Sequence, residues 1–102
     1  MTRSATKSPL EYEEFASVWD AIADSPEEAA NLRLRAELMR QLSSYIGAQG
    51  WTQVEAARRA CISQPRINDL LRGRIARFSL DALVNLAAAL GREVTVRLDD
   101  AA

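Results

Sequence analysis

A chain of 102 residues, 48% of them hydrophobic, has the length and composition of one small globular domain that buries about two-thirds of its unfolded surface. It has no histidine and one cysteine, which rules out an internal disulfide, the usual zinc sites and histidine-based catalysis, so we expect no enzyme, no metal and no cofactor. The N-terminus is polar and no apolar run approaches the about 20 residues that span a bilayer, so we expect a cytoplasmic protein without a membrane segment.

The net charge of −1 hides an uneven distribution. Residues 1–30 carry two basic and seven acidic residues, a net charge of −5, whereas residues 31–98 carry eleven arginines and five acidic residues, a net charge of +6. Arginine suits forked contacts to phosphate, although a GC-rich genome also favours it over lysine. We divide the chain at this change of charge into an acidic tail with an amphipathic helix (1–30) and a basic domain (31–98).

The first predicted helix follows a polar tail and ends near Ala23. Ser8, Pro9 and Glu11 form its start signal of N-cap, first-turn proline and N3 carboxylate. A stripe of apolar side chains recurs along this helix at helical spacing. The stripe either packs on the protein's own core or on a second copy, or docks in a groove of a basic partner. The stripe consists of Tyr12, Phe15, Trp19 and Ile22.

A second helix is predicted from Ser25 to the glycines Gly47 and Gly50, and we interpret it as a scaffold. Trp51 lies directly ahead of the next start signal. Its position favours a hydrophobic staple or core role over stacking on DNA bases. The apolar face of the scaffold helix comprises Leu34, Leu38, Leu42, Tyr45 and Ile46.

Two short helices joined by a tight turn are predicted over residues 52–72. In the first, Thr52 and Glu55 form a capping box. Val54, Ala57 and Ala60 are predicted to face inward, where a small residue at position 57 permits close crossing of the second helix.

The second helix of this pair is predicted to expose a polar face. Ile62 fills the space between the two helices, and Ser63 or Gln64 caps the second one. Its inward side is formed by Ile67, Leu70 and Leu71. The outward side suits the major groove of DNA, where Gln, Asn and Arg pair with base edges and arginines neutralise phosphates.

A loop and a further core helix follow. Arg74 and Arg77 in the loop are candidate phosphate contacts, with simple solvation as the alternative. Ser79 caps the next helix and Gly91 closes it. Its predicted buried face consists of Leu80, Leu83, Val84, Ala87 and Leu90.

Residues 93–98 alternate with period two and predict a β-strand, for which no other segment offers a partner. A lone strand leaves a row of backbone groups unpaired. We therefore expect a homodimer in which two strands pair antiparallel about a two-fold axis and bury Val94, Val96 and Leu98. The alternatives are pairing with a partner protein and a segment without structure in isolation.

The stretch from Gln53 to Leu70 resembles the helix-turn-helix of the XRE family, the repressors related to the lambda and Cro repressors. The segment ISQPRINDLLRGR…FSLDALVNLAAALG resembles a narrower group, the HigA-type antitoxins of type II toxin–antitoxin modules and their stand-alone relatives. The similarity covers roughly residues 18–98. Cys61 departs from the family, which usually has Gly there; if φ is positive at this turn, cysteine adds strain of about 1 kcal/mol.

The resemblance implies an all-α fold: a five-helix lambda-repressor-like helix-turn-helix domain with an N-terminal helical extension and a short C-terminal β-strand that pairs in a dimer. It also implies that Gln53 grips a phosphate. Asp69 either accepts from a cytosine amine or orients Arg66 or Arg72, and we prefer the orienting role. The predicted DNA-binding residues are Gln53, Gln64, Pro65, Arg66, Asn68, Asp69, Arg72, Arg74 and Arg77.

These predictions combine into a function. We expect a DNA-binding antitoxin that neutralises a ribonuclease toxin of the HigB or RelE kind and represses its own operon. Its DNA target is a double-stranded inverted repeat with half-sites about 34 Å apart. The acidic residues 1–30 suit a basic toxin. The alternative is a stand-alone XRE-type transcriptional repressor without a toxin partner.

Overall fold

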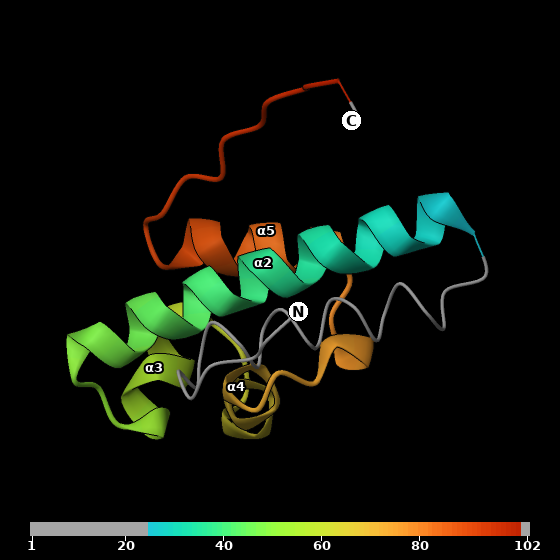
Figure 1. The fold of residues 1–102 in the computed structure, drawn as a ribbon. Helices are drawn as coiled ribbons and strands as arrows, with labels where there is room; N and C mark the ends of the chain where they lie inside the picture. The colour runs from blue at the N-terminus through green and yellow to red at the C-terminus, as the bar shows by residue number, and fades with distance from the viewer. Residues whose placement is uncertain (1–24, 101–102) are drawn as a thin grey trace, which may run out of the picture.

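The computed structural model describes residues 25–100, which contain four α-helices and one 3-10 helix (Figure 1). The long helix α2 runs across the molecule, with α5 on one side of it and α3 and α4 on the other. Residues 92–100 form an extended C-terminal arm above α2 and α5. The elements are α2 (Pro26–Gln49), α3 (Gln53–Ala60), α4 (Gln64–Leu71), η1 (Ile75–Arg77) and α5 (Leu80–Ala89).

Each of these α-helices begins at a hydroxyl N-cap, and the caps predicted within residues 25–100 are confirmed; the cap predicted at Ser8 lies outside the described residues. The side-chain oxygen accepts a hydrogen bond from the backbone N–H three residues on, which satisfies one of the free amides of the first turn. For α4, the sequence left Ser63 and Gln64 as alternative caps, and the structure has Ser63 as the N-cap. The capping residues are Ser25, Thr52, Ser63 and Ser79, with N···O distances of 3.0–3.3 Å.

Left-handed residues end three of the helices. Gly50 and Gly91 have φ of 73° and 75°, and Cys61 has φ of 60°. After α5, the Arg92 N–H donates to the Ala87 carbonyl at 2.8 Å, as in a Schellman motif. α2 continues through Gly47 and ends only at Gly50, because a single glycine inside a packed helix does not stop it.

The core lies where α2, α5 and the α3–α4 pair meet. Its largest fully buried side chains are Ile67, Leu70, Phe78 and Leu83. α3 contributes only alanines to this core, so its backbone comes close to α4 and α5. The prediction of small inward residues in α3 is thus confirmed for Ala57 and Ala60, to which the structure adds Ala56.

Four side chains predicted to be buried are partly exposed. Val54 lies off the face formed by the alanines of α3, and Leu71 is the last residue of α4, where the helix has moved past the core. Leu34 and Val84 lie beside the arm, in a groove that the chain leaves open. Their exposed fractions are 63% for Val54, 38% for Leu71, 55% for Leu34 and 40% for Val84.

The described residues show four α-helices, so the predicted count of five is not supported; the helix predicted near residues 8–23 lies outside them. Residues 75–77, within the predicted loop, form a short 3-10 helix. Residues 93–98 form no strand in the single chain, because no segment among residues 25–100 pairs with them. No described helix combines the length and apolar character needed to cross a membrane.

Candidate nucleic-acid interface

A three-residue turn joins α3 and α4. Cys61 is left-handed, with φ of 60° and ψ of 36°, and the Ile62 N–H donates to the Ala57 carbonyl at 3.1 Å, which closes α3. Ile62 packs partly buried against the core, as predicted. The positive φ at Cys61 means that its Cβ carries strain of about 1 kcal/mol at a position suited to glycine.

α4 buries one side and exposes the other. Ile67 and Leu70 are fully buried, whereas Gln64 and Pro65 at the N-terminal end are exposed and Asn68 is half-buried. The amides of glutamine and asparagine each offer a donor and an acceptor. The N-terminal end of α4 is therefore accessible and carries groups that match base edges.

Asp69 is buried on α4 and ties the helix to the loop that follows. Its carboxylate accepts hydrogen bonds from Nη1 of Arg74 at 3.1 Å and from Nη1 of Arg77 at 3.2 Å. The Arg74 N–H also donates to the Asp69 carbonyl at 3.0 Å. The chain turns back at Gly73, with φ of 72°, so residues five and eight positions later reach Asp69. Its carboxylate thus orients two arginines.

Arg66 is held against the protein. Its Nη1 donates to the Arg77 carbonyl at 2.7 Å, and its guanidinium carbon lies 4.2 Å from the centroid of the Phe78 ring. A cation–π contact of this kind contributes about 0.5–2 kcal/mol. The arginines that Asp69 orients are therefore Arg74 and Arg77, and the prediction that it orients Arg66 or Arg72 is wrong. The prediction failed because the chain folds back after Gly73 and brings Arg74 and Arg77 to Asp69, a contact that residue spacing along one helix does not reveal.

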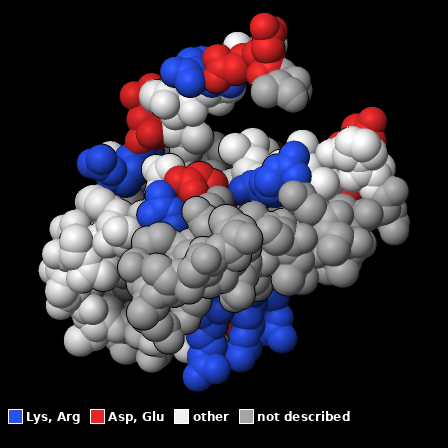
Figure 2. Space-filling view, viewed as in Figure 1, with Lys and Arg blue, Asp and Glu red and all other residues white. Residues whose placement is uncertain are grey.

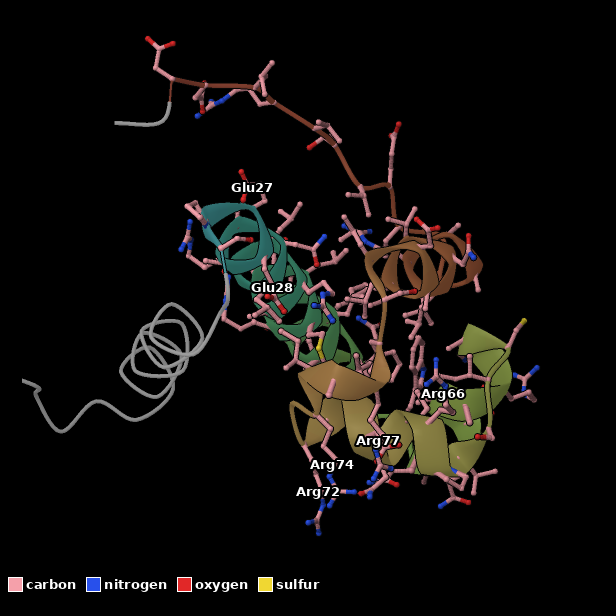
Figure 3. All side chains as sticks on the ribbon, turned by 90° about the vertical axis from the view of Figure 1, so that its right-hand side faces the viewer. Glu27, Glu28, Arg66, Arg72, Arg74 and Arg77 are labelled. Carbon is pink, nitrogen blue, oxygen red and sulfur yellow. The ribbon has the colours of Figure 1, made fainter. Side chains whose placement is uncertain are left out.

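Three exposed arginines gather where α4 ends, and we call them the exit-loop arginines: Arg72, Arg74 and Arg77. Figure 3 shows them at the same end of the molecule, beyond α4 and η1. In Figure 2 basic side chains project from this lower edge. The side chains of Arg74 and Arg77 remain 42% and 58% exposed despite their bonds to Asp69, so they can still meet a phosphate.

The geometry has a counterpart among known protein families. A family model described as a helix-turn-helix domain matches residues 21–99. The chain belongs to this helix-turn-helix family. Membership confirms the predicted helix-turn-helix, whose second helix is α4, and supports binding to DNA. A comparison with curated proteins gave no match.

Two residues that the sequence did not single out, Arg35 and Phe78, fix residues 72–78, which we call the exit loop of the helix-turn-helix. Nη1 of Arg35, on α2, donates to the carbonyl of Phe78 at 3.0 Å and to that of Ile75 at 3.3 Å. The Phe78 ring is 1% exposed and supports Arg66. These contacts join residues 40 and 43 positions apart, so no local pattern signals them.

α3 carries one predicted site residue and one perturbed carboxylate. Gln53 is half-buried at the start of the helix, and its phosphate contact stays a prediction. The Thr52 half of the capping box is present, but the Glu55 carboxylate bonds to Arg58 and to Arg59 instead, the latter at 2.6 Å. Hydrogen bonds from Arg58 and Arg59 hold the pKa of Glu55 below its usual value of 4.5.

The predicted dimer residues lie on the arm, on the side of the molecule opposite α4 (Figure 1). Val94 is half-buried and packs on the core, whereas Val96 is 91% and Leu98 96% exposed. A groove of about 450 Å³ lies between the arm, α2 and α5.

The predicted toxin-binding stripe lies outside the described residues: Tyr12, Phe15, Trp19 and Ile22. Within residues 25–100, no three side chains of the metal-binding types come together.

Proposed function

We propose that the protein is a sequence-specific transcriptional repressor that places α4 in the major groove of an inverted-repeat operator. The observation that carries the proposal is the arrangement around α4: its polar N-terminal end is accessible, and Asp69 holds two arginines beside its other end. A recognition helix that enters the groove at its N-terminal end, with basic residues beside it, is how helix-turn-helix proteins dock on DNA.

In this proposal the two ends of α4 have different tasks. Gln64 and Asn68 hydrogen-bond to base edges, and Pro65 makes apolar contact with them. The exit-loop arginines contact phosphates and set the position of α4. Arg66 reads a base only if its guanidinium leaves the Arg77 carbonyl, to which it donates at 2.7 Å. Acting as a dimer, the repressor reads half-sites about 34 Å apart.

Binding of two variants to the chain's own promoter fragment tests these tasks. Gln64→Ala should cost about 1–3 kcal/mol and relax the preference at one base position. Arg74→Ala should weaken binding to all sequences alike and reduce the slope of log K against log salt concentration by about one. Arg40→Ala removes an arginine from α2 and serves as the matched control. If Gln64→Ala and Arg74→Ala behave alike, the assignment of the α4 face is wrong.

We also propose that this repressor is an antitoxin of the HigA type, which neutralises a basic ribonuclease toxin and represses the operon that encodes both. The resemblance of residues 62–91 to that group supports the proposal, and so does the net charge of −5 on residues 1–30. In the described part of this acidic segment, Glu27 and Glu28 lie in the first turn of α2, well away from the exit-loop arginines (Figure 3). Toxin and DNA then use separate surfaces.

Co-expression with the neighbouring reading frame tests the antitoxin proposal. A basic product of that frame should co-purify with this chain, and its ribonuclease activity should be inhibited in the complex. Phe15→Ala combined with Trp19→Ala should abolish co-purification and leave operator binding unchanged, if the predicted stripe is the docking surface. If no basic neighbour binds while the promoter fragment is still bound, the protein is a stand-alone repressor.

A further inference from the structure

The C-terminal arm sorts its side chains into two rows. Side chains alternate along an extended chain, so Val94, Val96 and Leu98 share one row and Glu93, Thr95 and Arg97 the other. The apolar row starts against the helices, because Val94 packs on the core. Arg92, in the same phase, lies with its guanidinium 4.9 Å from the Tyr45 ring of α2.

The apolar row is not covered beyond its first residue. Val96 and Leu98 are 91% and 96% exposed, and the groove beside them is lined by Leu34 and Val84, which are 55% and 40% exposed. Branched apolar side chains on both sides of a groove bury little area in the single chain. Their exposure leaves room for an additional extended segment.

We propose that the segment that completes this surface is the arm of a second copy, paired antiparallel with a two-fold axis at Thr95. The inference rests on the proposed repressor acting as a dimer and specifies which residues meet. Residues whose numbers sum to 190 then face one another. Val94 of each copy lies opposite Val96 of the other, and Glu93 of each lies opposite Arg97 of the other.

The two rows limit the pairing to a few registers. Directly opposed residues of an antiparallel pair point to the same side, so the apolar row stays continuous only if the axis passes through a residue. With the axis at Val96, Glu93 would face Asp99 of the other copy, and these two like-charge pairs would offset the two opposite-charge pairs of Arg92 with Asp100. With the axis at Val94, Glu93 would face Thr95 and form no charge pair.

The axis at Thr95 is therefore the register that charge complementarity favours. It forms two opposite-charge pairs related by symmetry and no pair of like charges. In the single chain the Arg97 guanidinium lies 3.0 Å from the Asp99 carboxylate, and because these side chains are 85% and 62% exposed, this bond contributes little and can give way to Glu93 of the other copy. Because the arm and α4 lie on opposite sides of the molecule, this pairing leaves the recognition helix uncovered.

Charge reversal on the two residues tests the register with full-length protein. Glu93→Arg and Arg97→Glu, made separately, should each raise the dissociation constant of the homodimer by about tenfold or more, because two favourable pairs become two repulsive ones. An equimolar mixture of these two variants should recover the affinity as a mixed dimer, since each charge again meets its opposite. Differently tagged chains and sedimentation velocity measure both quantities.

The double variant with both reversals is the matched control. It keeps the net charge of the parent chain and should form homodimers about as tight as the parent's, yet should not mix with the parent chain. The proposal is overturned if the parent chain sediments as a monomer at micromolar concentration, if either single variant dimerises like the parent, or if the mixed dimer does not form.

Operator binding by the same variants separates this inference from the proposed function. If the charge reversals leave dimerisation unchanged and the operator is still bound, the arm register is wrong and the repressor proposal stands. If the dimer behaves as expected while no promoter fragment is bound at low salt, the arm is assigned correctly and the repressor proposal fails.

Discussion

The exit loop and the C-terminal arm each follow a helix and each carry charged side chains, but the protein holds them differently. The Asp69 carboxylate accepts hydrogen bonds from two arginines of the exit loop. Arg35 and Arg66 donate hydrogen bonds to backbone carbonyl groups of the same loop. The arm is anchored at its start by Arg92 and Val94, and its later apolar side chains are exposed.

This difference shows which of the two segments is held in place by contacts within a single chain. Buried polar groups need partners, and Arg35, Arg66 and Asp69 make hydrogen bonds to the exit loop from the helices that precede it. The arm has apolar side chains and backbone groups that no described segment covers. The helix-turn-helix and its exit loop are thus fixed by contacts within one chain, whereas the arm keeps Val96 and Leu98 exposed.

The largest expected effect comes from the core residue under the exit loop. Phe78→Ala removes a ring that is 1% exposed and supports Arg66, so the free energy of unfolding should fall by about 3–5 kcal/mol. Leu98→Ala, at a position 96% exposed, should change it by less than about 0.5 kcal/mol in the monomer. Urea denaturation at low protein concentration measures both. If Phe78→Ala and Leu98→Ala lowered the free energy of unfolding equally, the exit loop would not be packed more firmly than the arm.

The next effect tests the carboxylate that holds the exit loop. Asp69→Asn keeps the shape of the side chain but weakens its bonds to Arg74 and Arg77, and should lower the free energy of unfolding by about 1 kcal/mol, since both arginines are partly exposed. The variant is also more basic, so non-specific DNA binding should not weaken.

Operator binding should weaken in Asp69→Asn, because the two arginines lose their fixed positions. The ratio of specific to non-specific affinity, measured by competition with unrelated DNA, should therefore fall. Asp81→Asn removes an exposed carboxylate from α5 and is the matched control. An unchanged ratio in Asp69→Asn would mean that Asp69 serves stability alone.

A smaller effect, of opposite sign, is expected at the turn between α3 and α4. Cys61→Gly relieves the positive φ of 60° and should raise the free energy of unfolding by up to about 0.5 kcal/mol, after the greater flexibility of glycine in the unfolded chain is included. Cys61→Ala keeps the strain while removing the thiol, so it should show no such gain. Thermal unfolding of the three proteins side by side measures the difference.

The smallest effect concerns the surface of α3. The pKa of Glu55 is lowered in the folded state by its bonds to Arg58 and Arg59, so its contribution to stability is present above pH about 4.5 and is lost as the pH falls through the lower, folded-state pKa. Glu55→Gln should flatten this acid-side dependence. The difference in Tm between Glu55→Gln and the parent chain should shrink as the pH falls below 4.5.

Local signals along the chain predicted much of the fold. Ser25, Thr52, Ser63 and Ser79 each cap a helix, because a cap depends only on a hydroxyl and the amide three residues on. The helix-turn-helix was predicted for a similar reason, since its small and apolar positions are closely spaced. The left-handed backbone at Cys61 was anticipated from a departure at a single position.

Contacts between distant segments could not be predicted in this way. The partners of Asp69 depend on how the chain returns after Gly73, and the support from Arg35 comes from α2. The segment 93–98 has the alternation of a strand, but a strand also needs a neighbour, and pattern alone does not supply one. Val54 and Leu34 illustrate the same limit: spacing gives a helical stripe, while packing decides which edge of it is buried.

The placement of the arm on the side opposite α4 has a consequence for how such regulators diverge. In the arm register that we propose, a duplicated copy that exchanges the charges at positions 93 and 97 would assemble with itself and reject the original chain, while its DNA preference stays intact. Choice of subunit and choice of target can then evolve independently, and two descendants can work side by side in one cell without forming hybrids.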